Sequence, residues 1–418
     1  MRQDTTTLPT QEPSDLFEGA YFDNPYPTLS RLRETSPVHR FTFPLADAPV
    51  WIVTRYDHVR SVLSDPRFSV DGSAWASAEF RRAGLVVGEG TLFSQVISLV
   101  DPPDHTRIRR LAQGAFTPAR VERWRPKVRQ AVQAQVDRLR RKLAAEGRAE
   151  LLEDFAWPIP MQVISEVLGV ALDGIEDMAD IVARIYPTDP ALAPGIPRAF
   201  NDLAAFSRQL VVQKSRALTE DLTSDLIRAH VDGQRLDEEE LAALVLLLAI
   251  GGIETTRGLI ANAVVALSEF PDQVDGATAA PTLPPVATEE FLRHSGSAAN
   301  LMIRFATEDI ELAGRTIPTG GAVLPCVLSG NRDPRRFSRP DVLDLSRKEA
   351  KHLGLGHGIH NCLGAALARL EFSEAVPALY RALPDLRPAV PREELVYVPN
   401  WVVRMPQTLP VTTGAPPT

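Results

Sequence analysis

The sequence is poor in cysteine, in net positive charge and in long apolar runs. Only two of its 418 residues are cysteines, whereas a secreted disulfide scaffold would use more. The formal net charge of −8 disfavours a function that depends on binding nucleic-acid phosphates. The longest apolar run, 241–253, is too short to span a bilayer, and residues 1–10 carry no apolar signal segment. We therefore expect a cytoplasmic protein that binds neither nucleic acid nor a membrane.

Apolar spacing, caps and prolines indicate a mostly α protein with a minor β component. The 35 prolines are spread through the chain and divide it into many helices and ordered loops. The expected helices are 27–36, 57–64, 104–116, 118–146, 161–169, 202–219, 237–270, 289–294 and 362–383. The expected strands are 38–43, 50–54, 300–306, 310–312 and 322–328.

The longest expected helix, 237–270, decides the domain organisation. Asp237 can cap its start, and Glu240 can complete a capping box. At about 1.5 Å per residue the helix is roughly 50 Å long, enough to cross a whole domain. We therefore expect one domain, 14–414, after a flexible N-terminal tail, 1–13.

A glycine-rich loop, 352–364, ends at the second cysteine. Gly356 and Gly358 allow the backbone to bend tightly and approach a flat ligand closely. Cys362 falls at an expected helix start, where backbone N–H groups favour a thiolate. A lone cysteine is more often a small buried apolar residue, and zinc is disfavoured because no second cysteine lies nearby.

This loop resembles the haem-binding signature of the cytochromes P450, F-G-x-G-x-H-x-C-x-G. The matching positions are Gly356, Gly358, His360, Cys362 and Gly364. Leu355 stands where the family usually has phenylalanine, and Asn361 where bacterial members often have an aromatic residue. The resemblance implies a single-domain, triangular, mostly helical fold. It also implies that Cys362 is the proximal ligand of haem b.

A second motif lies within the longest expected helix, at Gly251, Gly252, Glu254 and Thr255. By itself this segment is equally typical of a kinked core helix with a polar pair, because adjacent glycines loosen a helix. It resembles the family motif [AG]-G-x-[DE]-T. The resemblance implies that Glu254 and Thr255 form the acid–alcohol pair that supplies protons during oxygen activation. The acid argues against the peroxygenase branch of the family.

Four residues are candidates to hold the two haem propionates. His105 and Arg109 lie at i and i+4 on one helical face, a pattern that is usually a solvated basic surface. Here it resembles the family's H-x-x-x-R. Arg304 matches the family arginine on a later strand, and His360 belongs to the cysteine loop.

Glu290 and Arg293 resemble the family's E-x-x-R, and Arg347 resembles the third member of the same network. The resemblance implies a buried ion network behind the cysteine loop. We expect its role to be architectural.

The expected function is that of a haem-thiolate mono-oxygenase, which inserts one oxygen atom of O2 into a medium or large, mostly neutral organic molecule by hydroxylation or epoxidation. Bacterial natural-product tailoring is the expected setting. Alternatives are ring coupling or desaturation, catabolic terpene or steroid hydroxylation, and a non-enzymatic haem protein. Electrons would come from a ferredoxin and an NAD(P)H-dependent ferredoxin reductase, and the protein would be a monomer. Substrate choice is expected to depend on 71–99, 185–200, 249–252, 297–303 and 399–401.

Overall fold

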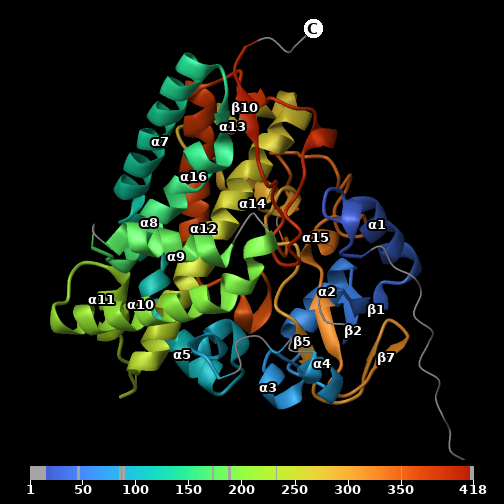
Figure 1. Cartoon of the computed structure of the whole chain (residues 1–418). Coiled ribbons are helices and arrows are strands. Elements are labelled where there is room, and N and C mark those ends of the chain that lie inside the picture. The colour runs from blue at the N-terminus through green and yellow to red at the C-terminus, as the bar shows by residue number, and fades with distance from the viewer. Residues whose placement is uncertain are drawn as a thin grey trace, which may run out of the picture.

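The computed structural model describes residues 16–44, 48–83, 86, 90–171, 174–186, 190–231, 233–349 and 351–414. Most helices gather on one side of the molecule, and the largest sheet lies on the other side with α1 (Tyr26–Thr35) and α2 (Tyr56–Ser64) (Figure 1). The predicted tail, 1–13, lies outside the described residues, and the single-domain boundary stays a prediction.

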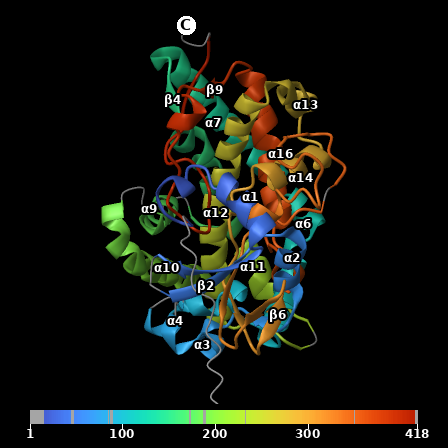
Figure 2. The same ribbon diagram turned by 90° about the vertical axis from the view of Figure 1, so that its right-hand side faces the viewer.

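Helix α12 (Glu238–Glu269) passes through the middle of the helical part in both side views (Figures 1 and 2). Asp237 and Glu240 form the predicted capping box at its start. Its residues are buried nearly all round, mainly by the helices α8 (Pro158–Leu168), α10 (Ile196–Arg216) and α16 (Ala365–Ala382). Helix α7 (Arg125–Glu146) packs against α8 and α16. Among the described residues this helix alone has the length and composition of a membrane span, but 78% of its most apolar window is buried within the protein.

The largest sheet has five strands in the order β1-β2-β8-β5-β3. Strands β1 (Val38–Phe43) and β2 (Ala48–Val53) are antiparallel, and β2 runs parallel to β8 (Ala322–Pro325). β8 then pairs with β5 (Arg304–Ala306), which pairs with β3 (Phe68–Ser69). Two smaller sheets join β4 (Ala149–Glu150), β10 (Pro410–Thr412) and β9 (Arg387–Pro388), and β6 (Ile310–Leu312) with β7 (Arg315–Ile317).

Several predicted bounds are wrong for identifiable reasons. The helix expected at 118–146 is two helices, α6 (Pro118–Glu122) and α7, because Pro126 cannot continue a preceding helix. The strand expected at 322–328 ends at Pro325, which lacks an N–H, and the short helix α15 (Val327–Gly330) follows. The strand expected at 300–306 begins only at Arg304, and the side chain of Asn300 donates to the carbonyl oxygen of Trp401.

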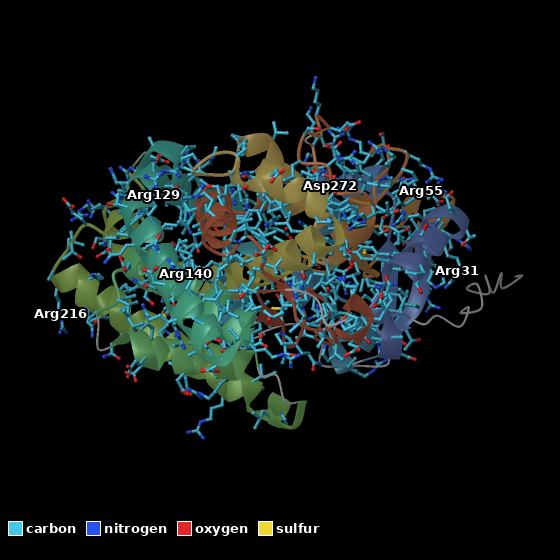
Figure 3. The ribbon with its side chains drawn as sticks, turned by 90° about the horizontal axis from the view of Figure 1, so that it is seen from above. Arg31, Arg55, Arg129, Arg140, Arg216 and Asp272 are labelled. Atoms are coloured by element: carbon cyan, nitrogen blue, oxygen red, sulfur yellow. The ribbon has the colours of Figure 1, made fainter. Side chains whose placement is uncertain are left out.

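Helices α9 (Ile175–Ile185) and α11 (Leu222–Arg228) were not predicted. Two further helices used below are α5 (Asp104–Gln113) and α14 (Pro285–His294). Seen from above, the labelled Arg31 and Arg216 lie on opposite sides of the molecule, with many side chains between them (Figure 3).

Candidate active site

The cysteine loop, residues 352–364, holds its sulfur in place through its own backbone. The N–H of Cys362 donates to the carbonyl oxygen of Leu355 at 2.8 Å. Gly356 and Gly358 have φ angles of +79° and +74°, which favour glycine. A β-carbon on Gly358 would also collide with the carbonyl group of Leu63. The glycines are therefore required by the loop's turn and by its close packing on α2.

The helix after the loop begins later than predicted. Helix α16 starts at Ala365, three residues beyond Cys362, so the cysteine precedes the helix and is not its first residue. Burial raises the pKa of the Cys362 thiol, whereas a hydrogen bond from the Gly364 N–H and the charge of Arg109 lower it. The backbone N–H groups therefore act in the expected direction, but burial outweighs them in the haem-free protein. A coordinating metal would have to supply that deprotonation.

Cys362 and the glycine-containing turn of α12 line the same cavity. This cavity, together with the open solvent at its mouth, has about 990 Å³ of space not filled by protein atoms. Gly251 and Thr255 of α12 contribute to its wall, as do apolar side chains such as Ile164 and Leu248. Gly364 also lines it, and a β-carbon there would meet no protein atom within 4 Å. The fold therefore brings the cysteine loop and the glycines and threonine of the α12 motif to one cavity.

Three buried side chains beside the cavity have polar atoms with no hydrogen-bond partner among the described residues. These atoms are both ring nitrogens of His105, Nε2 of His360 and Nε of Arg304. The two imidazole rings lie 4.3 Å apart between centroids, and the charge of Arg304 acts on both of them. Burial lowers the pKa of Arg304 to about 10 and that of His360 to about 3. Unsatisfied donors of this kind fit a ligand that brings carboxylates, as the two propionates of a haem would.

Arg109 is engaged differently from the other three propionate candidates. Its Nη1 donates to the carbonyl oxygen of Asn361 at 2.7 Å, and its Nη2 donates to Oδ1 of the same residue at 2.8 Å. Arg109 lines the cavity together with His105. It therefore fastens α5 to the residue before the cysteine, a contact that the sequence did not predict.

The acid and the alcohol of α12 face different surroundings. The hydroxyl of Thr255 donates to the carbonyl oxygen of Gly251 at 2.6 Å, and Thr255 lines the cavity. Glu254 is 2% exposed, and burial raises the pKa of its carboxyl. Its Oε2 lies 3.5 Å from Nη1 of Arg257 on the next helical turn.

Comparisons with known proteins agree with this geometry. Residues 285–381 match the family model described as Cytochrome P450. The chain is 41% identical to Cytochrome P450 monooxygenase PikC of Streptomyces venezuelae, over 93% of this chain and 91% of that protein. The chain belongs to the cytochrome P450 family. It is 37% identical to the Vitamin D(3) 25-hydroxylase of Pseudonocardia autotrophica, over 98% of both chains. Among solved structures, the P450 PksS of Bacillus subtilis matches with a TM-score of 0.85 at 30% identity, over 96% of this chain and 99% of that one.

The mostly helical P450 fold and the mono-oxygenase activity predicted from the sequence are therefore confirmed. P450 membership also implies a haem cofactor and a small-molecule substrate. The cavity and its unsatisfied donors fit that group, since they offer a cysteine at one wall and carboxylate-binding residues at its edge.

The predicted ion network lies behind the cysteine loop of this P450. Arg293 donates to Glu290 through Nε at 2.7 Å and Nη2 at 2.8 Å, and Arg347 donates to Oε1 of Glu290 at 3.1 Å. All three side chains are buried. Arg293 also donates to the carbonyl oxygen of Asn331, whose Oδ1 accepts from the N–H of Leu353 at 2.7 Å. The network therefore reaches the start of the cysteine loop through Asn331.

A second ion cluster beside this network was missed. Glu289 accepts from Nε of Arg369 at 2.6 Å and faces Nε2 of His352 at 3.1 Å. It is a part-buried group whose pKa these two partners lower to about 2. The cluster ties α14 to the start of the cysteine loop and to α16, which follows the loop, but the three residues are far apart in the sequence and match no spacing rule.

Glu371 was also missed. It is a fully buried carboxyl on α16 that lines the cavity, and burial raises its pKa to about 8. Its Oε2 has no hydrogen-bond partner among the described residues. The sequence gives no signal for it, because Arg369, Ser373 and Glu374 are other polar residues close by on the same helix.

Proposed function

We propose that this P450 binds haem b through the thiolate of Cys362 and oxidises a medium or large, mostly neutral organic molecule by hydroxylation or epoxidation. When bound, the haem supplies the redox chemistry that activates dioxygen, and a thiolate ligand favours O–O cleavage. The observation that carries the proposal is the single cavity lined by Cys362, Thr255 and His105. His105, Arg109, Arg304 and His360 would hold the propionates, while Gly356 and Gly364 would give the haem space.

The residues proposed to transfer protons both lie on α12. Glu254 is the buried acid, and Thr255 is the adjacent hydroxyl that reaches the cavity wall. Ser297 donates to the main-chain carbonyl oxygen of Thr255 at 2.6 Å, which fixes the loosened turn. We propose that Glu254 stores a proton and that the Thr255 hydroxyl positions its delivery. Positioned proton transfer typically contributes a factor of about 100 to 10,000.

The substrate class follows from the cavity wall and from the relatives. Ile97, Leu247 and Leu248 give an apolar lining close to Thr255. Ile97 and Gly251–Gly252 come from two of the segments predicted to choose the substrate. Relatives include a mycinamicin IV hydroxylase/epoxidase of Micromonospora griseorubida, 35% identical over 91% of this chain. These features support a step in bacterial natural-product tailoring.

Electron supply is proposed to come from a ferredoxin and an NAD(P)H-dependent ferredoxin reductase, with the protein acting as a cytoplasmic monomer. On the surface of α5, the guanidinium of Arg107 pairs with Glu240 of α12, so this ion pair adds little net charge to a docking face there. Arg110, which donates to Gln234 at 3.0 Å, remains on that exposed face. Docking between charged surfaces is screened by salt, so reduction by an acidic ferredoxin should slow as ionic strength rises.

The experiment that tests the proton relay measures product and hydrogen peroxide per NAD(P)H consumed. Thr255→Ala should bind substrate and still consume NAD(P)H, but should divert much of it to peroxide. Glu254→Gln should slow oxygen consumption itself. Ser268→Ala is the matched control, since Ser268 also bonds its own helix backbone but lies outside the cavity. If all variants stay as fast and as well coupled as wild type, the proposed relay is wrong.

A further inference from the structure

Asp101 is a carboxylate beside three side chains whose buried polar atoms lack a hydrogen-bond partner in the described structure, namely His105, Arg304 and His360. Its Oδ1 lies 4.0 Å from Nε2 of His360. Burial lowers the pKa of Arg304 and of His105, and the negative charge of Asp101 opposes that shift. These three residues are among those proposed to hold the haem propionates. A carboxylate of the protein therefore acts on the same donors as the carboxylates of the ligand would.

Contacts from two elements hold Asp101 in this position. The hydroxyl of Ser69 donates to its Oδ2, and the N–H of Val70 donates to its Oδ1 at 3.3 Å. Its own main-chain carbonyl oxygen accepts from the N–H of His105 at 3.0 Å, in the first turn of α5. Ser69 belongs to β3, which pairs with β5, the strand that begins at Arg304. Asp101 therefore links the helix that carries His105 to the sheet that carries Arg304.

Arg304 needs a countercharge while no ligand is bound. It is 5% exposed, and its Nε has no hydrogen-bond partner among the described residues. A buried cation is strongly destabilising unless a negative charge acts on it, and Asp101 supplies such a charge. The side chain of Asp101 is 30% exposed, so part of its carboxylate stays in water. A propionate paired with Arg304 would bring a second negative charge beside Asp101, and like charges repel.

We infer that Asp101 is a stand-in for a haem propionate, which provides a countercharge to Arg304 in the haem-free protein and competes with a propionate for Arg304 and His360 when haem binds. Asp101 is therefore a positioning residue that keeps these donors in place and weakens haem binding. The inference rests on the proposed assignment of Arg304 and His360 to the propionates. It requires that a neutral residue at position 101 lets the protein hold haem more tightly than wild type does.

A purely structural role of Asp101 predicts the opposite effect. Through Ser69 and Val70 its side chain fastens the start of α5 to the sheet, so a variant that disturbs these contacts should lose haem faster. Asparagine has almost the same shape as aspartate and keeps an oxygen that can accept from the Val70 N–H. Asp101→Asn therefore removes the charge and leaves the contacts largely in place. The direction in which haem loss changes separates the two roles.

The test measures haem transfer from the haem-loaded protein to an excess of a haem-scavenging protein. Asp101→Asn should lose haem about two- to fivefold more slowly than wild type, the factor expected for a charge pair with a partly exposed member. The midpoint potential of the bound haem should also become more positive, because the lost negative charge stabilised the ferric form. Asp104→Asn is the control, since it removes a nearby carboxylate whose side chain is 70% exposed.

A second arm of the experiment combines Asp101→Asn with Arg304→Leu. Arg304→Leu alone should lose haem faster than wild type. Adding Asp101→Asn should slow that loss again, because in Arg304→Leu the carboxylate acts on the propionate without a cation beside both. A structural role would instead make the double variant lose haem faster still. Asp101→Ser, which is neutral and smaller, carries the same comparison if the asparagine variant folds poorly.

Two results would overturn the role of Asp101. One is haem loss from both neutral variants at the wild-type rate or faster, and the other is a double variant that loses haem faster than Arg304→Leu. Failure of the underlying function looks different. If Arg304→Leu retains haem like wild type, the proposed propionate assignment is wrong. If Arg304→Leu loses haem faster while the neutral variants behave like wild type, only the inference about Asp101 is wrong.

Discussion

Replacing Arg304 by leucine should have opposite effects on haem binding and on the stability of the haem-free protein. Arg304 lies on β5, where its side chain is buried and its Nε has no hydrogen-bond partner in the described structure. Leucine is compatible with a strand and makes this buried position apolar. The variant therefore removes a cation that we assign to a propionate and leaves the sheet intact.

The structure sets the size of both effects. Burial lowers the pKa of Arg304 from 12.5 to about 10, which corresponds to about 3 kcal/mol of unfavourable burial without haem. Removing the guanidinium should therefore leave the haem-free protein at least as stable as wild type. A hydrogen bond to a charged group is worth about 1.5–3 kcal/mol. Its loss should weaken haem binding by roughly 10- to 150-fold.

The assay measures haem loss to an excess of a haem-scavenging protein, together with urea unfolding of the haem-free chain. Arg315→Leu is the control, because Arg315 is an exposed strand arginine on β7. Faster haem loss in Arg304→Leu alone, without lower stability, is the expected outcome. The reasoning is refuted if Arg304→Leu retains haem like wild type, or if it loses haem only because the chain is unfolded.

Two stability predictions accompany this one. Glu371→Gln should become progressively more stable than wild type as the pH rises from 4.5 to about 8. Burial raises the pKa of Glu371, so the folded wild-type protein favours the protonated carboxyl. Wild type therefore loses stability over this pH range, whereas the uncharged glutamine does not titrate. The difference should grow by about 1.4 kcal/mol per pH unit, and parallel pH curves would contradict it. Glu290→Gln should cost about 3–5 kcal/mol in urea unfolding, because it leaves Arg293 and Arg347 buried without a carboxylate. Equal stability of Glu290→Gln and wild type would show that the network is dispensable.

The local geometry that was predicted correctly is the geometry that a short stretch of sequence determines. The cysteine loop fixes its own geometry through Gly356 and Gly358, and the capping box at Asp237 joins residues three apart. Arg293 reaches Glu290 along one helix face. Spacing rules apply to such contacts, because their partners are neighbours on one element.

The contacts that were missed join segments far apart in the chain. Arg109 bonds Asn361, and Arg257 bonds Glu153, across 252 and 104 residues. Neither pair has a spacing that could reveal it, because packing of separate helices alone brings the partners together. The start of α16 was misplaced because Gly364 precedes the helix, so the turn continues past Cys362.

The central claim is that the thiolate of Cys362 ligates the haem, and the absorption spectrum of the reduced protein with carbon monoxide tests it most directly. The chain has one matched control, Cys326→Ser, which removes the other cysteine, a buried residue directly after β8 that does not line the cavity. Wild type and Cys326→Ser should show the red-shifted band of a thiolate-ligated haem. Cys362→Ser should bind haem without that band. A Cys362→Ser protein that keeps the band would contradict the account.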